Sequence, residues 1–279
     1  MRKITEKMIT DYELYLRNEE RSNATIEKYS RDLLAFLLFL PMDKHFSKET
    51  VICYKEYLTA HYAPASVNSM LAALNGFLSF MEWTECKVKP LKIQRKVFCP
   101  KEKELTKQEY LRLIEAAKSR KNQRLCLVME TICSTGIRVS ELCFITVEAV
   151  KCGRVDVYCK GKTRTIFLPA KLCNKLKEYF REKGIERGTV FVTKNGKPLN
   201  RSNIWHDMKA LCEQAEVESS KVFPHNLRHL FARTYYRIEK DLGRLADLLG
   251  HSNIETTRIY TVSTGVEHAK QVNSLELVV

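Results

Sequence analysis

The sequence predicts a mainly α-helical protein of two domains, the second of which also holds a small antiparallel β-sheet. The chain has 279 residues, which exceeds the ~100 to 200 residues of a usual single domain. Apolar residues recur with helical spacing along most of it. One segment, residues 154–169, instead alternates apolar and polar residues on both sides of a basic tip, which is typical of a β-hairpin. With 44% hydrophobic residues, the chain can fill two cores.

Residues 1–86 are predicted to form a small all-helical domain. Ser22 or Asn23 is placed to cap the second helix and Ser47 the third, and Pro64 opens the fourth, where its missing N–H costs nothing. Short connections between amphipathic helices are typical of a bundle. No motif in this domain indicates a function. The helical patterns cover residues 5–20, 23–40, 47–60 and 64–83.

Residues 87–103 are predicted to be an extended basic linker. They contain seven basic residues, one acidic residue and two prolines, so continuous helix is disfavoured and the segment stays solvated. Two interpretations remain open: a plain connector, or a strap in which Lys92, Arg95 and Lys96 lie along phosphates. The position between two domains favours the strap.

The second domain, residues 104–279, is predicted to be helical around the hairpin. Thr106 and Glu109 form a capping box, and Gly136 closes the helix of residues 122–136. A short strand is expected at residues 189–193. The other predicted helices cover residues 170–183, 200–215, 225–239, 241–249 and 254–261.

The formal charge of +14 lies mostly in this second domain. Residues 1–100 hold 15 basic and 12 acidic residues, and the remainder holds 32 and 21. Such a field attracts polyanions, of which nucleic acid is the commonest in a cell. The sequence has no run of 18 apolar residues and no signal-peptide pattern, so we expect a soluble cytoplasmic protein, associated with the nucleoid and not with a membrane.

The cysteines predict neither disulfides nor a zinc site. There are ten, scattered singly without a C-x-x-C pair, and that spacing does not suit a structural zinc. Cys126 and Cys133 lie in an apolar helical pattern, where cysteine acts as a small buried hydrophobe. Reduced thiols in a cytoplasm fit this usage.

A set of polar residues interrupts the apolar patterns of the second domain. Each has an ordinary structural explanation when taken alone, so the interpretation rests on the whole set. In chain order the set is Arg138, Lys160, His225, Arg228, His251 and Tyr260.

The segments "STGIRVSEL", "KGKTR", "HNLRH" and "LLGHSNIETTRIYT" together resemble the tyrosine recombinases, the phage integrase and Xer-like group. The residue order matches that family's catalytic set, as do the 23 positions from Arg228 to His251 and the nine from His251 to Tyr260. The resemblance implies a two-domain, C-shaped DNA clamp, with an N-terminal helical core-binding (SAM-like) domain before a C-terminal catalytic domain.

The roles that the resemblance implies agree with phosphodiester chemistry. Guanidinium groups match the non-bridging oxygens of a phosphate, which suits Arg138 and Arg228. Tyr260 would attack phosphorus with His225 as proton acceptor, and Lys160 would protonate the departing 5′ oxygen, with Lys162 as a weaker rival. His251 would hydrogen-bond the scissile phosphate. Glu141 or His229 would support these residues, and Lys162 and Arg164 are further predicted DNA contacts.

This chemistry requires no metal and no cofactor. The partners implied by the resemblance are a double-stranded DNA recombination site and a tetramer across two duplexes, made of this chain alone or with a second recombinase, that exchanges strands through a Holliday junction. Residues 262–279 would reach a neighbouring subunit, although their composition departs from a typical Xer tail. The compact N-terminus predicts no extra arm-binding domain.

Other functions compete with this interpretation. His225 and His229 have the i, i+4 spacing of zinc ligands, but Asn226 stands where a metalloprotease has its glutamate. A catalytically idle DNA-binding regulator of the same fold would share the charge, yet it has no need for all six catalytic positions. A type IB topoisomerase would share the chemistry without strand exchange.

Overall fold

The computed structural model describes residues 2–93, 104–159, 162–193, 195–251, 253–260 and 273–274, without the side chains of Cys159 and Lys162. The chain divides into two compact units, Met1–Arg95 and Lys96–Val279. Both units are mainly helical, and each described sheet is a two-stranded antiparallel pair. The predicted fold class is therefore confirmed.

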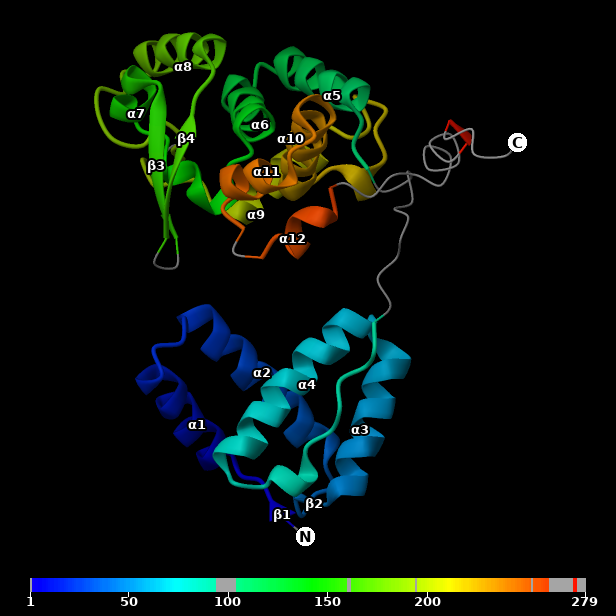
Figure 1. The fold of residues 1–279 in the computed structure, drawn as a ribbon. Helices are drawn as coiled ribbons and strands as arrows, with labels where there is room; N and C mark the ends of the chain where they lie inside the picture. Colours follow the sequence, from blue (N-terminus) through cyan, green and yellow to red (C-terminus); the bar gives the residue numbers. More distant parts are fainter. Residues whose placement is uncertain are drawn as a thin grey trace. The chain divides into compact units, whose positions relative to one another are not determined.

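The first unit is a helical bundle closed at its base by a short strand pair (Figure 1). The caps follow the sequence: Ser22 accepts a hydrogen bond from the backbone of Thr25, Ser47 forms a capping box with Thr50, and Pro64 is the first residue of its helix. The strand pair was not predicted. In chain order the elements are β1 (Arg2–Lys3), α1 (Glu6–Asn18), α2 (Asn23–Phe39), β2 (His45–Phe46), α3 (Lys48–His61), α4 (Pro64–Phe80) and the 3-10 turn η1 (Thr84–Cys86).

The described start of the predicted linker is extended, and two asparagines of α4 hold it on this unit. The Asn75 amide accepts from the N–H of Val88 (3.1 Å) and donates to its carbonyl (2.8 Å). One helical heptad earlier, Asn68 does the same with Leu91, at 2.7 and 2.9 Å. Val88 is buried. The backbone of residues 88–91 is therefore held on the first unit.

The second unit surrounds one large apolar core, in which α6 packs against α10. The β3–β4 hairpin stands beside α7 and α8 (Figure 1). In chain order the elements of the second unit are α5 (Lys107–Ser119), α6 (Gln123–Thr135), η3 (Val139–Phe144), α7 (Val147–Cys152), β3 (Arg154–Cys159), β4 (Lys162–Phe167), α8 (Ala170–Glu182), α9 (Arg201–Lys209), η4 (Ser219–Lys221), α10 (Pro224–Glu239), α11 (Leu242–Leu249) and α12 (Glu255–Arg258).

Several elements of the second unit differ from the prediction: α7 and the 3-10 turns η3 and η4 were not predicted, and the helix expected over residues 254–261 is helical only over Glu255–Arg258 among its described residues. Residues 189–193 form isolated bridges, Thr146 with Thr189 and Val192 with Pro198, because their backbone partners lie in loops and not along a neighbouring strand. The helix expected over residues 200–215 stops as α9 at Lys209, where i to i+3 hydrogen bonds tighten the chain into turns. The capping box of Thr106 with Glu109 and the left-handed Gly136 after α6 are confirmed.

Within the described part of the chain, no helix is both long and apolar enough to cross a bilayer. The cysteines described there are free thiols. On α6, Cys126 is buried as the pattern predicted, whereas Cys133 is only half-buried.

Candidate active site

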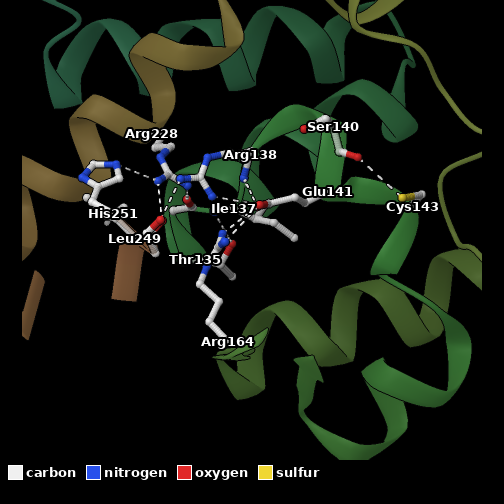
Figure 2. Close-up of polar contacts among 12 residues, drawn as sticks. Thr135, Ile137, Arg138, Ser140, Glu141, Cys143, Arg164, Arg228, Leu249 and His251 are labelled. Atoms are coloured by element: carbon white, nitrogen blue, oxygen red, sulfur yellow. Dashed lines mark hydrogen bonds and ion pairs between the residues drawn. The ribbon is translucent and has the colours of Figure 1, made fainter. Parts of the chain in front are cut away.

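Four segments of the second unit bring Arg138, Arg164, Arg228 and His251 together, and Tyr260 follows α12. The four segments are the turn after α6, strand β4, helix α10, and residues 249–251 at the end of α11. Figure 2 shows the guanidinium groups of Arg228, Arg138 and Arg164 gathered between His251 on one side and Glu141 on the other. Three positively charged guanidinium groups thus lie close together, and each needs hydrogen-bond acceptors or a negative charge to hold it there.

Arg228 projects from α10 into the interior, where only 1% of the residue is exposed. Its Nη1 donates to the carbonyl of Gly136 (2.6 Å), and its Nη2 donates to the carbonyl of Leu249 (2.7 Å) and to Nε2 of His251 (3.1 Å). Burial, and then the charge of Arg138, lower the pKa of Arg228 to about 10. The guanidinium therefore remains charged at neutral pH, fixed by backbone carbonyls from two sides.

Arg138 caps the turn η3 and shares the carboxylate of Glu141 with Arg164. Its Nη1 lies 2.9 Å from Oε1 of Glu141, and its Nη2 donates to the carbonyl of Gly250 (3.1 Å). Because 31% of the Arg138 side chain is exposed, its other N–H groups are accessible to a ligand. A guanidinium carries five N–H groups, so two internal bonds leave a fork for an oxyanion.

His251 is held from both ring nitrogens. Its Nε2 faces Arg228, and its Nδ1 lies 2.8 Å from the hydroxyl of Thr257. Burial, and then the charges of Arg228 and Arg138, lower the pKa of His251 to about 4. The ring is therefore neutral at physiological pH. Since Arg228 only donates, Nε2 is the acceptor and Nδ1 carries the proton to Thr257.

Tyr260 lies against the site of its own chain. Its ring packs edge-on to His229 (centroids 4.9 Å apart) and parallel to His251 (6.1 Å). It is buried with Ala232, Leu245 and Leu249. Burial raises the pKa of Tyr260, and the charge of Arg228 only partly opposes this. The free phenol is thus protonated at neutral pH and requires a proton acceptor to react.

His225 lies one turn before His229 on α10 and is exposed. The two imidazole rings are 4.6 Å apart, so His229 contacts both His225 and Tyr260. Loss of surrounding water, and then the charges of Arg228, Arg201 and Arg138, lower the pKa of His225 below its ordinary value. A neutral imidazole is the form that accepts a proton.

Not every predicted site residue can be placed. Lys160, Arg95 and Lys96 lie outside the described residues, as does the side chain of Lys162, and Lys92 is exposed at the end of the segment held on α4. Arg164 was predicted to contact DNA, which stays a prediction. Its guanidinium is directed at Glu141.

Two supporting residues were not predicted from the sequence. Gly250 lies beside both Arg138 and Arg164, and Thr257 orients His251. A left-handed glycine closing α11 was a recognisable signal for the first. The second had none, because threonine in a short helix is ordinary.

In the part of the chain that is described, no group of three or more His, Cys, Asp or Glu residues is arranged to hold a metal ion. The rings of His225 and His229 contact each other edge-on.

Residues 103–265 match the phage integrase family, and residues 9–85 match the phage integrase N-terminal SAM-like domain. The chain belongs to the phage integrase family. It is 30% identical over 281 residues to the tyrosine recombinase XerC of Halalkalibacterium halodurans, covering 92% of each chain. It is 29% identical over 276 residues to the tyrosine recombinase XerA of Thermococcus kodakarensis, covering 95% of this chain and 93% of the relative. The resemblance to the tyrosine recombinases is thus confirmed, and this recombinase is a site-specific recombination enzyme.

Solved structures share the fold of this recombinase. A lambda integrase tetramer bound to a Holliday junction matches with a TM-score of 0.73 at 19% identity, over 91% of this chain and 76% of that one. The XerH recombinase bound to its difH substrate, in a pre-cleavage complex, matches with a TM-score of 0.69 at 21% identity, over 96% and 84% of the two chains.

Proposed function

We propose that this recombinase cleaves and rejoins DNA strands through a 3′-phosphotyrosine intermediate formed on Tyr260. The observation that carries the proposal is the place of Tyr260 itself. Among the described residues it is the one tyrosine whose ring contacts both His229 and His251, and His251 is hydrogen-bonded to Arg228. Nucleophile, histidines and guanidinium groups thus come from one chain.

The phosphate would be held between Arg138 and Arg228. In phosphoryl transfer the charge develops on the non-bridging oxygens, where guanidinium forks bind bidentately and stay charged. Arg138 offers exposed N–H groups beside Glu141. When a phosphate oxygen takes the Arg228 N–H that now meets Nε2 of His251, that imidazole can move its proton to Nε2 and donate to the same phosphate.

Bond breaking and bond formation balance without a cofactor. The Tyr260 oxygen forms a bond to phosphorus as the bond from phosphorus to the 5′ oxygen breaks. His225 accepts the phenolic proton, and Lys160 gives a proton to the departing oxygen. The phosphotyrosine link retains the energy of the broken diester, so the reverse reaction rejoins the strand.

The DNA partner and assembly follow from the relatives. Related recombinases are solved on DNA sites, one as a tetramer on a Holliday junction and one on its difH substrate. We infer that this chain also acts on a double-stranded recombination site as a tetramer, alone or with a second recombinase, in the nucleoid. The same strand exchange serves integration and excision of a mobile element or resolution of chromosome dimers.

A nicked suicide substrate, which lets the cut end diffuse away, tests the proposal. Wild-type protein should accumulate a denaturant-resistant adduct on the 3′ phosphate, with or without a chelator, and Tyr260→Phe should form none while it still binds the site. An adduct formed by Tyr260→Phe would move the nucleophile to another residue, such as Tyr235 or Tyr236. Cleavage that needs a divalent metal and leaves no adduct would rule out this chemistry.

Mapping the adducts on genomic DNA separates the two biological roles. Cleavage at the ends of a mobile element indicates integration and excision. Cleavage at a single chromosomal site indicates dimer resolution. An assay with two duplexes further separates strand exchange from simple relaxation by a topoisomerase.

A further inference from the structure

The carboxylate of Glu141 is saturated with donors. Its Oε1 accepts from Nη1 of Arg138 (2.9 Å) and from Nη1 of Arg164 (2.9 Å). Its Oε2 accepts from the backbone N–H of Arg138 (2.8 Å) and from Nη2 of Arg164 (2.6 Å). A carboxylate has about four lone-pair sites, so the two arginines fill them all. Figure 2 shows both guanidinium groups directed at this one carboxylate.

The two arginines use Glu141 differently. Arg164 binds both oxygens as a bidentate pair through Nη1 and Nη2, whereas the Arg138 guanidinium reaches only Oε1. Bidentate pairing is the stronger geometry, and it is closed to Arg138 as long as Arg164 occupies both oxygens. Arg138 is therefore left with N–H groups directed away from the carboxylate.

Because Glu141 is buried, its carboxylate depends on these arginines and not on water for its hydrogen bonds. Glu141 is 3% exposed and the side chain of Arg164 is 12% exposed. Burial alone would raise the pKa of Glu141, but the hydrogen bonds from Arg164 and Arg138 outweigh it and lower that pKa. A buried carboxylate that lost Arg164 would take its missing hydrogen bonds from Arg138, the nearest remaining donor.

Gly250 provides the passage for Arg164. A Cβ at this position would lie 2.8 Å from Cδ and 3.0 Å from Nη1 of Arg164. Gly250 has φ +63°, and its carbonyl accepts from Arg138. Because Gly250 has no side chain, the Arg164 side chain can pass over its Cα, while the Gly250 carbonyl holds Arg138.

We propose that Arg164 is a positioning residue of the recombinase, which occupies both oxygens of Glu141 as a bidentate pair and so keeps the Arg138 fork free for the scissile phosphate. This inference rests on the proposed function, because it assigns Arg138 to that phosphate. It differs from the sequence-based expectation that Arg164 contacts DNA, since both terminal nitrogens of Arg164 already bond to Glu141.

The test compares Arg164→Met with wild type on three suicide substrates: a normal diester, a methylphosphonate, and a 5′-bridging phosphorothiolate. The methylphosphonate is uncharged at phosphorus and needs less from Arg138. The phosphorothiolate has a thiolate leaving group that needs no proton. Arg154→Met, at an exposed position of the same hairpin, is the matched control and should cleave at the wild-type rate.

We expect Arg164→Met to cleave the normal diester at least ~10-fold more slowly, with site affinity within ~2-fold of wild type, because the lost interaction acts only on the transition state. The defect should shrink on the methylphosphonate and persist on the phosphorothiolate. In a Glu141→Gln background, Arg164→Met should add little, since the proposed effect passes through that carboxylate.

Three results would overturn the inference. One is an unchanged rate on the diester, and another is rescue by the phosphorothiolate, which would place the effect at the leaving group. The third is an equal loss on all three substrates with a lowered melting temperature, which would make the residue merely structural. Absence of any adduct with wild-type protein is a separate result and would count against the proposed function.

Discussion

His229 contacts Tyr260 edge to face, with ring centroids 4.9 Å apart and ring planes at 89°. Nε2 of His229 is buried and has no hydrogen-bond partner among the described residues. Burial, and then the neighbouring His225 and Arg228, lower the pKa of His229 to about 4. The ring that packs beside the proposed nucleophile is therefore neutral at physiological pH.

Because this histidine is neutral when folded, we predict that the second unit loses stability in acid. In the unfolded chain the pKa of histidine is ~6.5, so below that pH the unfolded state binds a proton that the folded state binds only near pH 4. The contribution of such a histidine to the free energy of unfolding is therefore constant above pH ~6.5. It falls as the pH drops from there toward 4, by up to ~1.4 kcal/mol per pH unit. His251, with its pKa of about 4, contributes in the same direction.

Denaturant unfolding at pH 7.5, 5.5 and 4.5 measures the effect. His229→Gln should be less stable than wild type at pH 7.5 but should lose less on acidification. His206→Gln, at an exposed position of α9, is the control and should keep the wild-type profile. Identical pH slopes for wild type and His229→Gln would show that His229 is not held neutral.

Arg228→Lys separates charge from geometry. Lysine keeps the positive charge but cannot reach Gly136, Leu249 and His251 with a planar fork. We expect cleavage to fall by roughly 10²-fold or more, with little change in DNA affinity. Stability should also fall by ~1–3 kcal/mol, because buried carbonyls lose a donor. Single-turnover cleavage and urea unfolding measure the two effects, with Arg244→Lys on the exposed side of α11 as control. Wild-type cleavage by Arg228→Lys would remove Arg228 from the phosphate site.

Local sequence signals predicted the helices and their ends well where the signal is itself local. The capping box of Thr106 with Glu109, and Gly136 in the left-handed conformation, are set by residues within one turn. The bridges around residues 189–193 were beyond this logic, because the N–H of Val190 bonds to the carbonyl of Ile145, far away in sequence. Partners of that kind leave no periodic pattern.

The motifs predicted the site residues, and the resemblance named Glu141 or His229 as their support, but the pairing of Arg164 with Glu141 was not predicted. The order of Arg138, Arg228, His251 and Tyr260 is readable in the sequence. The pairing of Arg164 with Glu141 spans 23 positions, and a basic residue near a hairpin tip ordinarily indicates a solvated or DNA-binding charge. Only the fold shows that this arginine turns inward.

The predicted strap can be tested by salt dependence. If Lys92, Arg95 and Lys96 lie along phosphates, replacing all three by Gln should flatten the slope of log affinity against log salt by about 0.9 per lost contact. The measurement is a titration of the recombination site at several salt concentrations. Equal slopes for the variant and wild type would show that these three residues make no phosphate contacts and that the segment is only a connector.

The asparagines of α4 predict that the start of this segment is ordered before DNA binds. The N–H of Val88 donates to Asn75 and that of Leu91 donates to Asn68, so both amides should be protected from hydrogen exchange in the free protein. Asn75→Ala should remove the protection at Val88 and cost about 1–3 kcal/mol, since it leaves a backbone N–H and a carbonyl without partners. Ser79→Ala, one turn later on an exposed position of α4, should leave Val88 protected. Fast exchange at Val88 in wild-type protein would show that the segment leaves α4 in solution. The structure would then not fix the position of Lys92 relative to α4 before DNA binds.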